Sequence, residues 1–425
     1  MPEIQLNPIT LRFPLGINNR DRETDLPEGA LRSAENIDIT NGGNLLCRKG
    51  LRLVASGSFH SLYRAPNFLL LVKNGVLSRM DSSGTITSLV TLAVNSTVRY
   101  AQFNSSVYWS TLYEQGLITS AGDTGYFGIN TPPKIVAASV SNSGGLFAGD
   151  YLVTQTAVLP DGLESGAPEP VTVSVETGGG IDVTVPAGAT FNVYVTPANG
   201  SSKELRFALQ LPSGGSATIG VGDRGKLLES LFATKPYPGQ ILRSHKGRLW
   251  IARGATIWVT SSNSPHWLFP ATGYFQIEEN ITLLESVEDG LYIGTNNKTW
   301  FLRVTNPEEI KEMTMRQVSS VGAVSGTGLG EFPYDVFAGQ DAQVKQCAWL
   351  DKEGYICVGK AGGIIVRPTK ANYCAGNILS GVLGFRQYNG LRQFVVALDS
   401  SGESSGLIAD DTPVGTINEY GTSLV

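Results

Sequence analysis

Short apolar segments alternate with glycine-containing turns along the second half of the chain, and this pattern repeats. The repeats are KGRLWIARGATIWVT from Lys246, DGLYIGTNNKTWFL from Asp289, EGYICVGKAGGIIV from Glu353 and NGLRQFVVAL from Asn389. Each combines a glycine, an apolar strand, a turn and usually a second strand. The glycines Gly247, Gly290, Gly354 and Gly390 are 43, 64 and 36 residues apart. Two of these spacings are close to one four-stranded propeller blade, and the third has room for a blade and a loop.

Weaker copies of the same pattern precede these repeats. They are PNFLLLVKNGVLSRMDSSGTITSLV from Pro66 and NSSVYWSTLYEQGLITS from Asn104, with a further strand pair between Gly43 and Val54. Asn74-Gly75 in the first copy predicts a hairpin turn, since both residues tolerate positive φ. The copies together predict an all-β protein, a β-propeller of about six or seven blades. We expect the propeller to be closed, because an open array would expose sheet edges.

The middle of the chain has a different texture. Between residues 132 and 239, seven short alternating segments are separated by DG, GGG and NG turns. This spacing is typical of an immunoglobulin or fibronectin-III sandwich, and the absence of a cysteine pair and of tryptophan favours the fibronectin type. We therefore predict an N-terminal arm (1–42), a first propeller part (43–131), an inserted fibronectin-III/Ig-like sandwich (132–239) and a second propeller part (240–425).

The arm contains LPEGALRSAENIDI, residues 26–39, which predicts a short helix in a chain of strands. Asp25 is placed to cap its first turn, and Pro27 is tolerated within that turn. Leu26, Leu31 and two alanines would lie on one helical face.

Composition supports the β prediction and limits the function classes. Charged residues make up 16% of the chain, against about 25% in an average globular protein, while glycine reaches 50 of 425 residues. The net charge of -5 argues against a protein that binds nucleic-acid phosphates through an excess of cations. No segment reaches the roughly 18 apolar residues of a membrane span, and the N-terminus does not resemble a signal peptide. We expect a soluble protein that folds in a reducing cytosol.

The cysteines and histidines do not form a recognisable site. The four cysteines, Cys47, Cys347, Cys357 and Cys374, contain no CxxC pair, and there are three histidines. Reduced thiols are therefore expected, with a Cys357–Cys374 disulfide as the alternative, and no metal or cofactor is predicted.

Catalytic constellations are not evident either. The histidines His60, His245 and His266 lack metal-binding spacing, and no GxSxG elbow occurs. An acidic group could bind a cation or serve a glycosidase, although solvated strand ends explain it more simply. Its members are Glu278, Glu279, Glu285, Glu288 and Asp289. We predict that the protein is not an enzyme.

The beginning of the chain carries a family resemblance. FPLGINNRDRETDLPEGALRSAENIDITNGGNLLCRKGLRLV, residues 13–54, contains a GINN element, an LPEGAL segment, an N-x-D-I strand and a G-x-L-x-x-R-x-G turn. This segment resembles the start of a family of bacteriophage tail proteins. The resemblance extends through GDYLVTQTAVLPDGLES and FNVYVTPANG into GRLWIARGATIWVTSSNSPHWLF, and reaches about Gly330.

The resemblance implies a structural virion protein of a short-tailed phage, a propeller-bearing tail nozzle or hub assembled in the host cytoplasm. Such proteins form a ring, here a homohexamer, below the portal and the head-to-tail adaptor. The ring lines the channel for DNA ejection and anchors other tail parts, which can include fibres or tail-tip proteins.

Two groups of residues follow from this interpretation as hypotheses. The arm would dock on a neighbouring subunit or on the adaptor, through Asn18, Asn19, Leu26, Leu31 and Asn36. The acids Glu279 and Asp289 would face the lumen, where like charge keeps passing DNA off the wall.

Two other classes of function stay open. A glycan- or receptor-binding propeller at the tail tip would expose tryptophan and tyrosine residues at repeated rim positions. The tryptophans at blade positions are Trp109, Trp250, Trp258, Trp300 and Trp349. Most of these tryptophans are expected to fill the space between blades instead. A glycosidase-like propeller would use two carboxylates of the acidic group.

Overall fold

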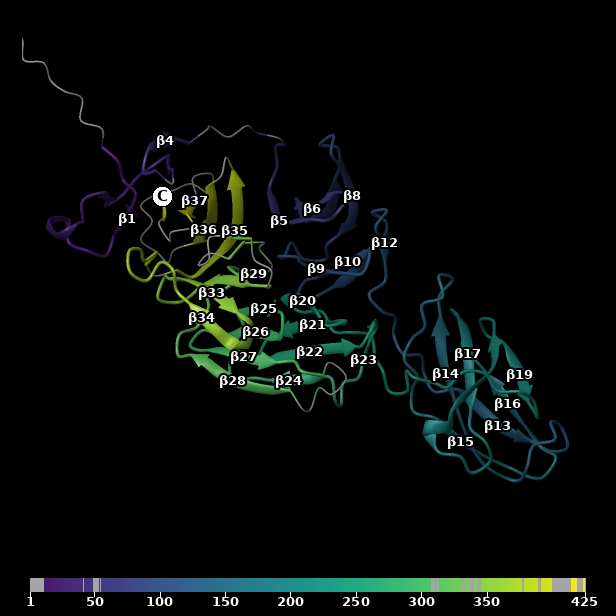
Figure 1. Cartoon of the computed structure of the whole chain (residues 1–425). Coiled ribbons are helices and arrows are strands. Elements are labelled where there is room, and N and C mark those ends of the chain that lie inside the picture. The colour runs from purple at the N-terminus through teal and green to yellow at the C-terminus, as the bar shows by residue number, and fades with distance from the viewer. Residues whose placement is uncertain are drawn as a thin grey trace, which may run out of the picture. The chain divides into compact units, whose positions relative to one another are not determined.

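The computed structural model describes residues 11–40, 42–48, 53, 55–306, 310, 313–330, 332, 334–335, 340–341, 345–376, 378–388, 391–399, 414–418 and 423–424. The chain divides into two compact units. Their strands are labelled in Figure 1. One unit consists of Met1–Gly57 with Ile277–Val425, and the other of Ser58–Gln276. No helix in the described ranges is long and apolar enough to cross a membrane.

The Ser58–Gln276 unit contains three antiparallel sheets built as meanders. The first joins β5 (Phe59–Arg64), β6 (Leu69–Lys73), β7 (Val76–Met80) and β8 (Ile86–Thr91). The second joins β9 (Arg99–Phe103), β10 (Ser106–Ser110), β11 (Gln115–Ile118) and β12 (Thr124–Gly125). The third joins β20 (Ile241–His245), β21 (Arg248–Arg253), β22 (Thr256–Ser261) and β23 (Ser264–Leu268), and β24 (Tyr274–Gln276) also pairs with β22.

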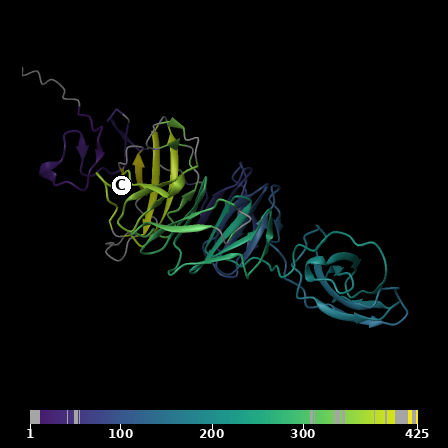
Figure 2. The same ribbon diagram turned by 60° about the horizontal axis from the view of Figure 1, so that its bottom comes forward.

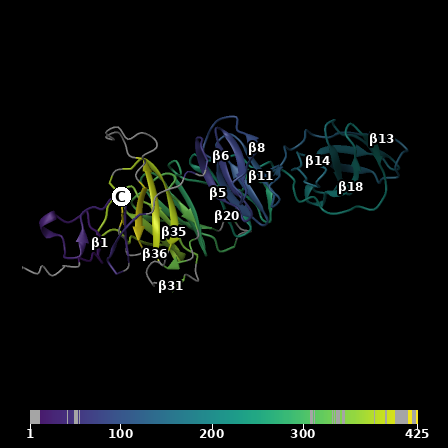
Figure 3. The same cartoon turned by 90° about the horizontal axis from the view of Figure 1, so that it is seen from above.

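The other unit contributes three more sheets of this kind. The first joins β25 (Leu283–Val287), β26 (Gly290–Gly294), β27 (Thr299–Arg303) and β28 (Thr314–Ser319). The second joins β29 (Leu329–Gly330), β32 (Cys347–Leu350), β33 (Ile356–Lys360) and β34 (Ile364–Val366). The third joins β35 (Ser380–Tyr388), β36 (Leu391–Asp399), β37 (Val414–Asn418) and β38 (Ser423–Leu424). A small hairpin pairs β30 (Tyr334–Asp335) with β31 (Gln340–Asp341). The long hairpin β35–β36 is visible in Figure 3.

These sheets are propeller blades, and the described residues form six of them. In the β25–β28 blade, burial falls from the first strand to the last. All of β25 and β26 is buried, whereas β28 is mostly exposed. The predicted all-β propeller is therefore confirmed, and so is the Asn74-Gly75 turn, whose φ angles of 53° and 78° close the β6–β7 hairpin.

Large side chains fill the space between successive blades within each unit. In the unit that ends the chain, Tyr292 of β26 packs 5.1 Å from Trp349 of β32, measured between ring centroids. In the Ser58–Gln276 unit, Phe103 and Phe127 pack with Leu242 and Ile251 of the third blade. Burying these apolar surfaces on both faces of a sheet stabilises the stack.

Between the second and third blades, the chain forms two further sheets. One has the order β13 (Val136–Val140), β16 (Gly180–Thr184), β19 (Ser216–Ile219), and the other has the order β15 (Val171–Val175), β14 (Gly149–Val158), β17 (Thr190–Val195), β18 (Arg206–Leu211). The two layers are drawn in teal in Figure 2. Val153, Ile181 and Val193 belong to a single buried core fed by both sheets. The predicted kinship with fibronectin-III or Ig domains, and the domain boundaries, stay predictions.

The N-terminal segment contains short strands and one 3₁₀ turn. β1 (Gly16–Ile17) pairs in parallel with β2 (Ala30–Leu31), β3 (Ile37–Ile39) pairs with β4 (Leu45–Cys47), and η1 spans Glu23–Asp25.

The helix predicted at residues 26–39 is wrong. Gly29 has a φ of 88°, and the N–H of Ala30 donates to the carbonyl of Pro27, so Pro27 to Ala30 form a turn. A left-handed glycine ends a helix instead of continuing it, and the chain beyond it enters β2. Asp25 is the last residue of η1 and not a helix cap.

The packing between blades predicts a large effect for a small addition at Gly359. A β-carbon there would lie 2.6 Å from Cε2 of Tyr292 and 2.8 Å from Cζ3 of Trp349. Gly359→Ala should lower the free energy of unfolding by about 1–3 kcal/mol, measured from urea midpoints. Gly384→Ala is the control, because its β-carbon would meet only the Val395 oxygen, at 3.9 Å. It should leave stability unchanged or raise it by about 0.5 kcal/mol. Equal effects of the two variants would contradict the packing argument.

Candidate functional site

Asn19 ties the N-terminal segment to a distant loop of its own unit. Its side-chain Nδ2 donates to the carbonyl of Cys374 (2.8 Å), and its Oδ1 accepts from the N–H of Cys374 (3.0 Å). Its backbone N–H donates to the carbonyl of Asn372 (3.0 Å). The side-chain amide of Asn19 therefore donates to and accepts from the backbone of the same residue, as a paired residue in a β-sheet does.

The other four predicted arm residues have different surroundings. Asn18 is buried, and its Oδ1 accepts from the N–H groups of Arg20 and Asp21 (3.1 Å each), which shapes the loop. Leu26 and Leu31 are half-buried, and Asn36 is exposed with a φ of 55°. The structure does not bring the five side chains into one cluster.

The segment buries one apolar side on its own chain. Ile17, Ala34 and Ile39 pack against Tyr373, with Leu31 half-buried beside them. Five leucines of the segment are exposed: Leu11 (70%), Leu15 (46%), Leu45 (39%), Leu46 (52%) and Leu53 (80%). Exposed leucines on a docked segment are candidates for a surface that another molecule could cover.

Two arginines that contact Tyr355 also hold the N-terminal segment in place. The guanidinium carbon of Arg20 lies 5.3 Å from the ring centroid of Tyr355, and that of Arg367 lies 6.0 Å from it. Arg20 also donates to the Tyr355 hydroxyl. Arg367 Nε in turn lies 2.9 Å from the carboxylate of buried Asp351. Burial raises the pKa of Asp351 to about 6, against the opposing pull of Arg367.

The two acids predicted to face the lumen lie at opposite ends of β26. Glu279 accepts from the backbone N–H (3.3 Å) and Nδ2 (3.1 Å) of Asn297, beyond the end of the strand. The hydrogen bond from the Asn297 side chain is the main cause that lowers the pKa of Glu279. Asp289 precedes the strand, and both its carboxylate oxygens lie 3.0 Å from the N–H of Gly362.

A paired-carboxylate site is not assembled from these acids. Asp289 lies before β26, and Glu279 contacts Asn297 after it. The five residues of β26 span roughly 17 Å, which exceeds the ~10 Å separation of the two carboxylates in a glycosidase. Glu278 pairs with Lys298 (3.3 Å) at the surface, Glu285 is fully buried, and Glu288 is exposed. No group of three or more His, Cys, Asp or Glu side chains suited to a metal occurs in the described part of the chain.

The histidines are hydrogen-bonded, buried or packed against an aromatic ring, and the cysteines are free thiols. The ring nitrogens of His60 lie 2.8 Å from Ser61 Oγ and 2.8 Å from Asn95 Oδ1. His245 is buried, and burial lowers the pKa of His266, which lies beside Trp267. All four cysteines are free, which excludes the alternative Cys357–Cys374 disulfide here.

A polar network around Glu164 was not anticipated from the sequence. Its Oε1 accepts from Thr156 Oγ1 (2.5 Å), the Tyr194 hydroxyl (2.6 Å) and Asn192 Nδ2 (3.1 Å). Its Oε2 accepts from Lys226 Nζ (3.0 Å). Burial opposes ionisation of Glu164, but these hydrogen bonds outweigh it and lower the pKa.

The network also holds a blade. The indole N–H of Trp267 in β23 donates to the backbone carbonyl of Glu164 (2.8 Å). Burial and the Glu164 charge raise the pKa of Tyr194, so its hydroxyl remains a donor at neutral pH. The network therefore connects the loop after β14 with β17 and with β23, and it holds these three parts together.

Three aromatic side chains form a row on the third blade. The ring centroids of Tyr237 and Trp258 are 4.8 Å apart, and those of Trp258 and Tyr274 are 5.6 Å apart. Trp258 and Tyr237 are half-buried, and Tyr274 is 44% exposed. Trp109, Trp250 and Trp349, in contrast, are buried, and Trp300 is half-buried.

Comparison with known proteins gives no family for this chain. No protein-family model matches the chain, and no curated protein matches it significantly. Among solved structures, the chain is similar to the Pan2 WD40 domain of Neurospora crassa (8% identity, 80% of this chain and 86% of that one, TM-score 0.33). It is also similar to virginiamycin B lyase from Staphylococcus aureus (12%, 80% and 91%, 0.31) and to the Dos1 propeller (8%, 87% and 81%, 0.33).

These three include an enzyme and no phage tail protein. At such identities and scores the likeness carries no conclusion about activity. The propeller class rests on the six blade sheets of this chain.

The Glu164 network predicts a pH dependence of stability. Because the folded pKa of Glu164 is lowered, its contribution is present above the unfolded pKa of 4.5 and is lost as the pH falls through the folded value. Glu164→Gln should cost about 1–3 kcal/mol at pH 7 and less at pH 4, measured by urea unfolding.

Glu169→Gln is the matched control on the same loop. Glu169 pairs with Lys134 (2.5 Å), but both side chains are more than half exposed, so little effect is expected at either pH. A pH-independent loss in Glu164→Gln would show that its charge does not stabilise the network.

Proposed function

We propose that this protein is a structural component of a phage tail, a nozzle or hub subunit that assembles into a ring, with six copies as the expected number. Its partners would be further copies of itself, the head-to-tail adaptor and, at the periphery, fibres or tail-tip proteins. DNA would contact it only in transit. The family resemblance of residues 13–54 motivates this proposal.

The observation that best supports it is the two-sided N-terminal segment. Ile17 and Ile39 are buried on the chain's own Tyr373, and Asn19 fixes the backbone. Away from this buried contact, Leu15 and Leu46 of the same segment are about half exposed. The segment is thus held in place by its own subunit while it offers apolar surface outward.

Such a surface suits a ring. A head-to-tail ring needs two different complementary surfaces on each subunit, and it closes when the rotation between neighbours divides a full turn. Burial of an exposed leucine by a partner lowers the free energy of the assembly by about 25 cal/mol per Å² of apolar surface. The docked segment would be one of these surfaces, with a neighbouring subunit as its occupant.

The surroundings of the acids are compatible with a non-enzymatic role. Glu278, Glu279 and Asp289 are engaged with Lys298, with Asn297 and with a backbone N–H, respectively. We propose that the protein is not an enzyme. The lumen position of Glu279 and Asp289 remains part of the nozzle proposal, and their places at opposite ends of β26 mean that one of them can face the channel without the other.

The ring proposal predicts loss of assembly when the exposed leucines become polar. Leu15→Ser with Leu46→Ser should leave the thermal midpoint nearly unchanged, since both side chains are exposed. Wild-type protein should form rings, alone or on a candidate adaptor ring, and the double variant should stay monomeric. Mass measurement in solution and negative-stain imaging distinguish the two.

Leu112→Ser provides the control. Leu112 is 39% exposed and lies in the other unit, so its replacement should not change assembly. A wild-type protein that stays monomeric with the adaptor present, or a double variant that assembles normally, would contradict the proposal.

A second function, glycan binding at the tail tip, is favoured by the aromatic row. Tyr237, Trp258 and Tyr274 are contiguous, and flat aromatic surfaces with adjacent polar groups suit the apolar faces of sugar rings. The row occurs on one blade, however, whereas a propeller built for glycans was predicted to expose aromatics at repeated positions.

This alternative predicts loss of glycan binding in Trp258→Ala and in Tyr274→Ala. If wild-type protein binds a host polysaccharide on a glycan array, each replacement should weaken binding by at least tenfold, a loss of about 1.4 kcal/mol. Tyr113→Ala is the control, because Tyr113 is 60% exposed on a different blade. Absence of wild-type binding, or binding that survives both replacements, would exclude the row as a glycan site.

A further inference from the structure

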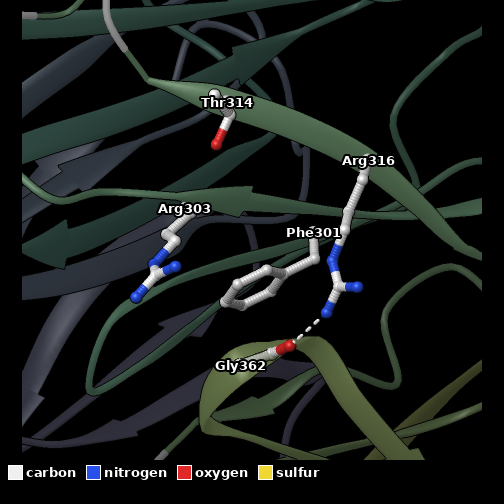
Figure 4. Close-up of a pocket in the computed structure, with 5 residues that line it drawn as sticks. All are labelled: Phe301, Arg303, Thr314, Arg316 and Gly362. Carbon is white, nitrogen blue, oxygen red and sulfur yellow. Dashed lines mark hydrogen bonds between the residues drawn. The ribbon is translucent and has the colours of Figure 1, made fainter.

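A cavity of about 400 Å³ lies on the outer part of the β25–β28 blade. Its described lining is Phe301, Arg303, Thr314, Arg316 and Gly362 (Figure 4). The volume lies within the range of small-molecule sites, which span about 300–1,000 Å³. Neither the ring proposal nor the glycan alternative uses this cavity.

Strand register explains why these side chains converge. Phe301 and Arg303 of β27 are two residues apart and therefore share one face of the sheet. Their antiparallel partners on β28 are Arg316 and Thr314, respectively. Directly paired residues of an antiparallel sheet also share a face, so two cations, an aromatic ring and a hydroxyl form one block.

The far wall of the cavity comes from the next blade. Gly362 belongs to η4 (Ala361–Gly363) and has a φ of 76°. Arg316 Nη2 donates to its carbonyl, shown by the dashed line in Figure 4. The N–H of Gly362 is held by the carboxylate of Asp289 (3.0 Å to each oxygen). Both polar groups of Gly362 are thereby fixed.

The floor of the cavity is rigid as well. Phe301 is 1% exposed and packs 5.1 Å from Tyr292. In Figure 4 its ring lies between the side chains of Arg303 and Arg316. A fixed ring between two guanidinium groups limits the directions in which they can turn.

The charged side chains of the described lining are all positive. Arg303 and Arg316 are exposed, and no carboxylate belongs to the described lining. Asp289, the nearest acid named by these contacts, accepts a hydrogen bond from the N–H of Gly362. Two like charges on one face repel each other, so an anion between them would relieve the repulsion as well as accept hydrogen bonds. Guanidinium groups bind carboxylates and phosphates with two parallel hydrogen bonds.

We propose that this cavity binds an oxyanion carried by a small hydroxylated molecule, with a sugar acid as the best fit. The carboxylate would accept hydrogen bonds from Arg303 and Arg316, and the Thr314 hydroxyl would bond to a sugar hydroxyl. Free phosphate shares the oxyanion chemistry and is the second source of such a ligand. The site is separate from the leucine surface and from the Tyr237–Trp258–Tyr274 row.

The test is isothermal titration of the full chain at low salt with three probes: glucuronate, glucose and inorganic phosphate. Wild-type protein should bind glucuronate saturably and glucose at least tenfold more weakly. Arg303→Gln and Arg316→Gln should each reduce glucuronate affinity by at least tenfold. Arg316→Lys should recover only part of it, since lysine keeps the charge but not the two-pronged geometry.

Controls separate binding from folding. Arg253→Gln removes an exposed arginine from a blade of the other unit and should bind glucuronate like the wild type. Arg303→Gln should retain the wild-type thermal midpoint within about 2 °C, because that side chain is exposed. Arg316→Gln also removes the hydrogen bond to Gly362, so its affinity is compared with that of Arg316→Lys at matched thermal midpoints.

The three probes also identify the source of the ligand. Tighter binding of glucuronate than of phosphate supports the sugar acid, and equal or tighter binding of phosphate supports a bare oxyanion at the same arginines. If neither anion binds to wild-type protein, or if binding persists in the double Arg303→Gln/Arg316→Gln variant, the proposal is overturned.

Discussion

The buried hydroxyl of Tyr292 is the contact on which the packing of the β25–β28 blade against the next blade depends. It lies 2.6 Å from the carbonyl of Lys360 and 2.7 Å from that of Ile364, the residues that flank η4. Burial raises the pKa of Tyr292, so the phenol keeps its proton and can donate at neutral pH. Its ring meanwhile packs against Trp349 and Phe301. One side chain thus joins two blades and fixes the loop that forms a wall of the arginine cavity.

The N-terminal segment follows the same logic of local fixation. Its Asn19 binds the backbone around Cys374, and Arg20 stacks on a tyrosine that Arg367 contacts as well. Arg367 is anchored by buried Asp351, whose carboxylate also accepts from the N–H groups of Glu353 and Tyr355. A segment fixed by its own subunit loses little further entropy when it meets a partner, which favours assembly. This makes its exposed leucines a better candidate interface than a free tail.

The sequence predicted those features that depend on local pattern. Gly-centred hairpins gave the blades, because a strand pair and its turn lie within a dozen residues. The helix failed at Gly29, where a single left-handed residue overrode the apolar spacing of Leu26 and Leu31. The Glu164 network was not predictable, since its partners Thr156, Asn192 and Lys226 come from separate segments. Which tryptophans are buried was also beyond pattern alone, because strand alternation does not say which face is covered.

Net charge was the least informative quantity, and the arrangement of charges explains why. A chain with a net charge of -5 still places Arg303 and Arg316 in the lining of one cavity, and its acids Glu279 and Asp289 serve first as hydrogen-bond acceptors for neighbouring loops. A carboxylate that holds a loop is still negative toward solvent, so structural and electrostatic roles can coexist in it. Its effect on a passing or bound anion falls off within about 10 Å at moderate salt. Local geometry therefore decides whether this acidic protein repels an anion or holds one.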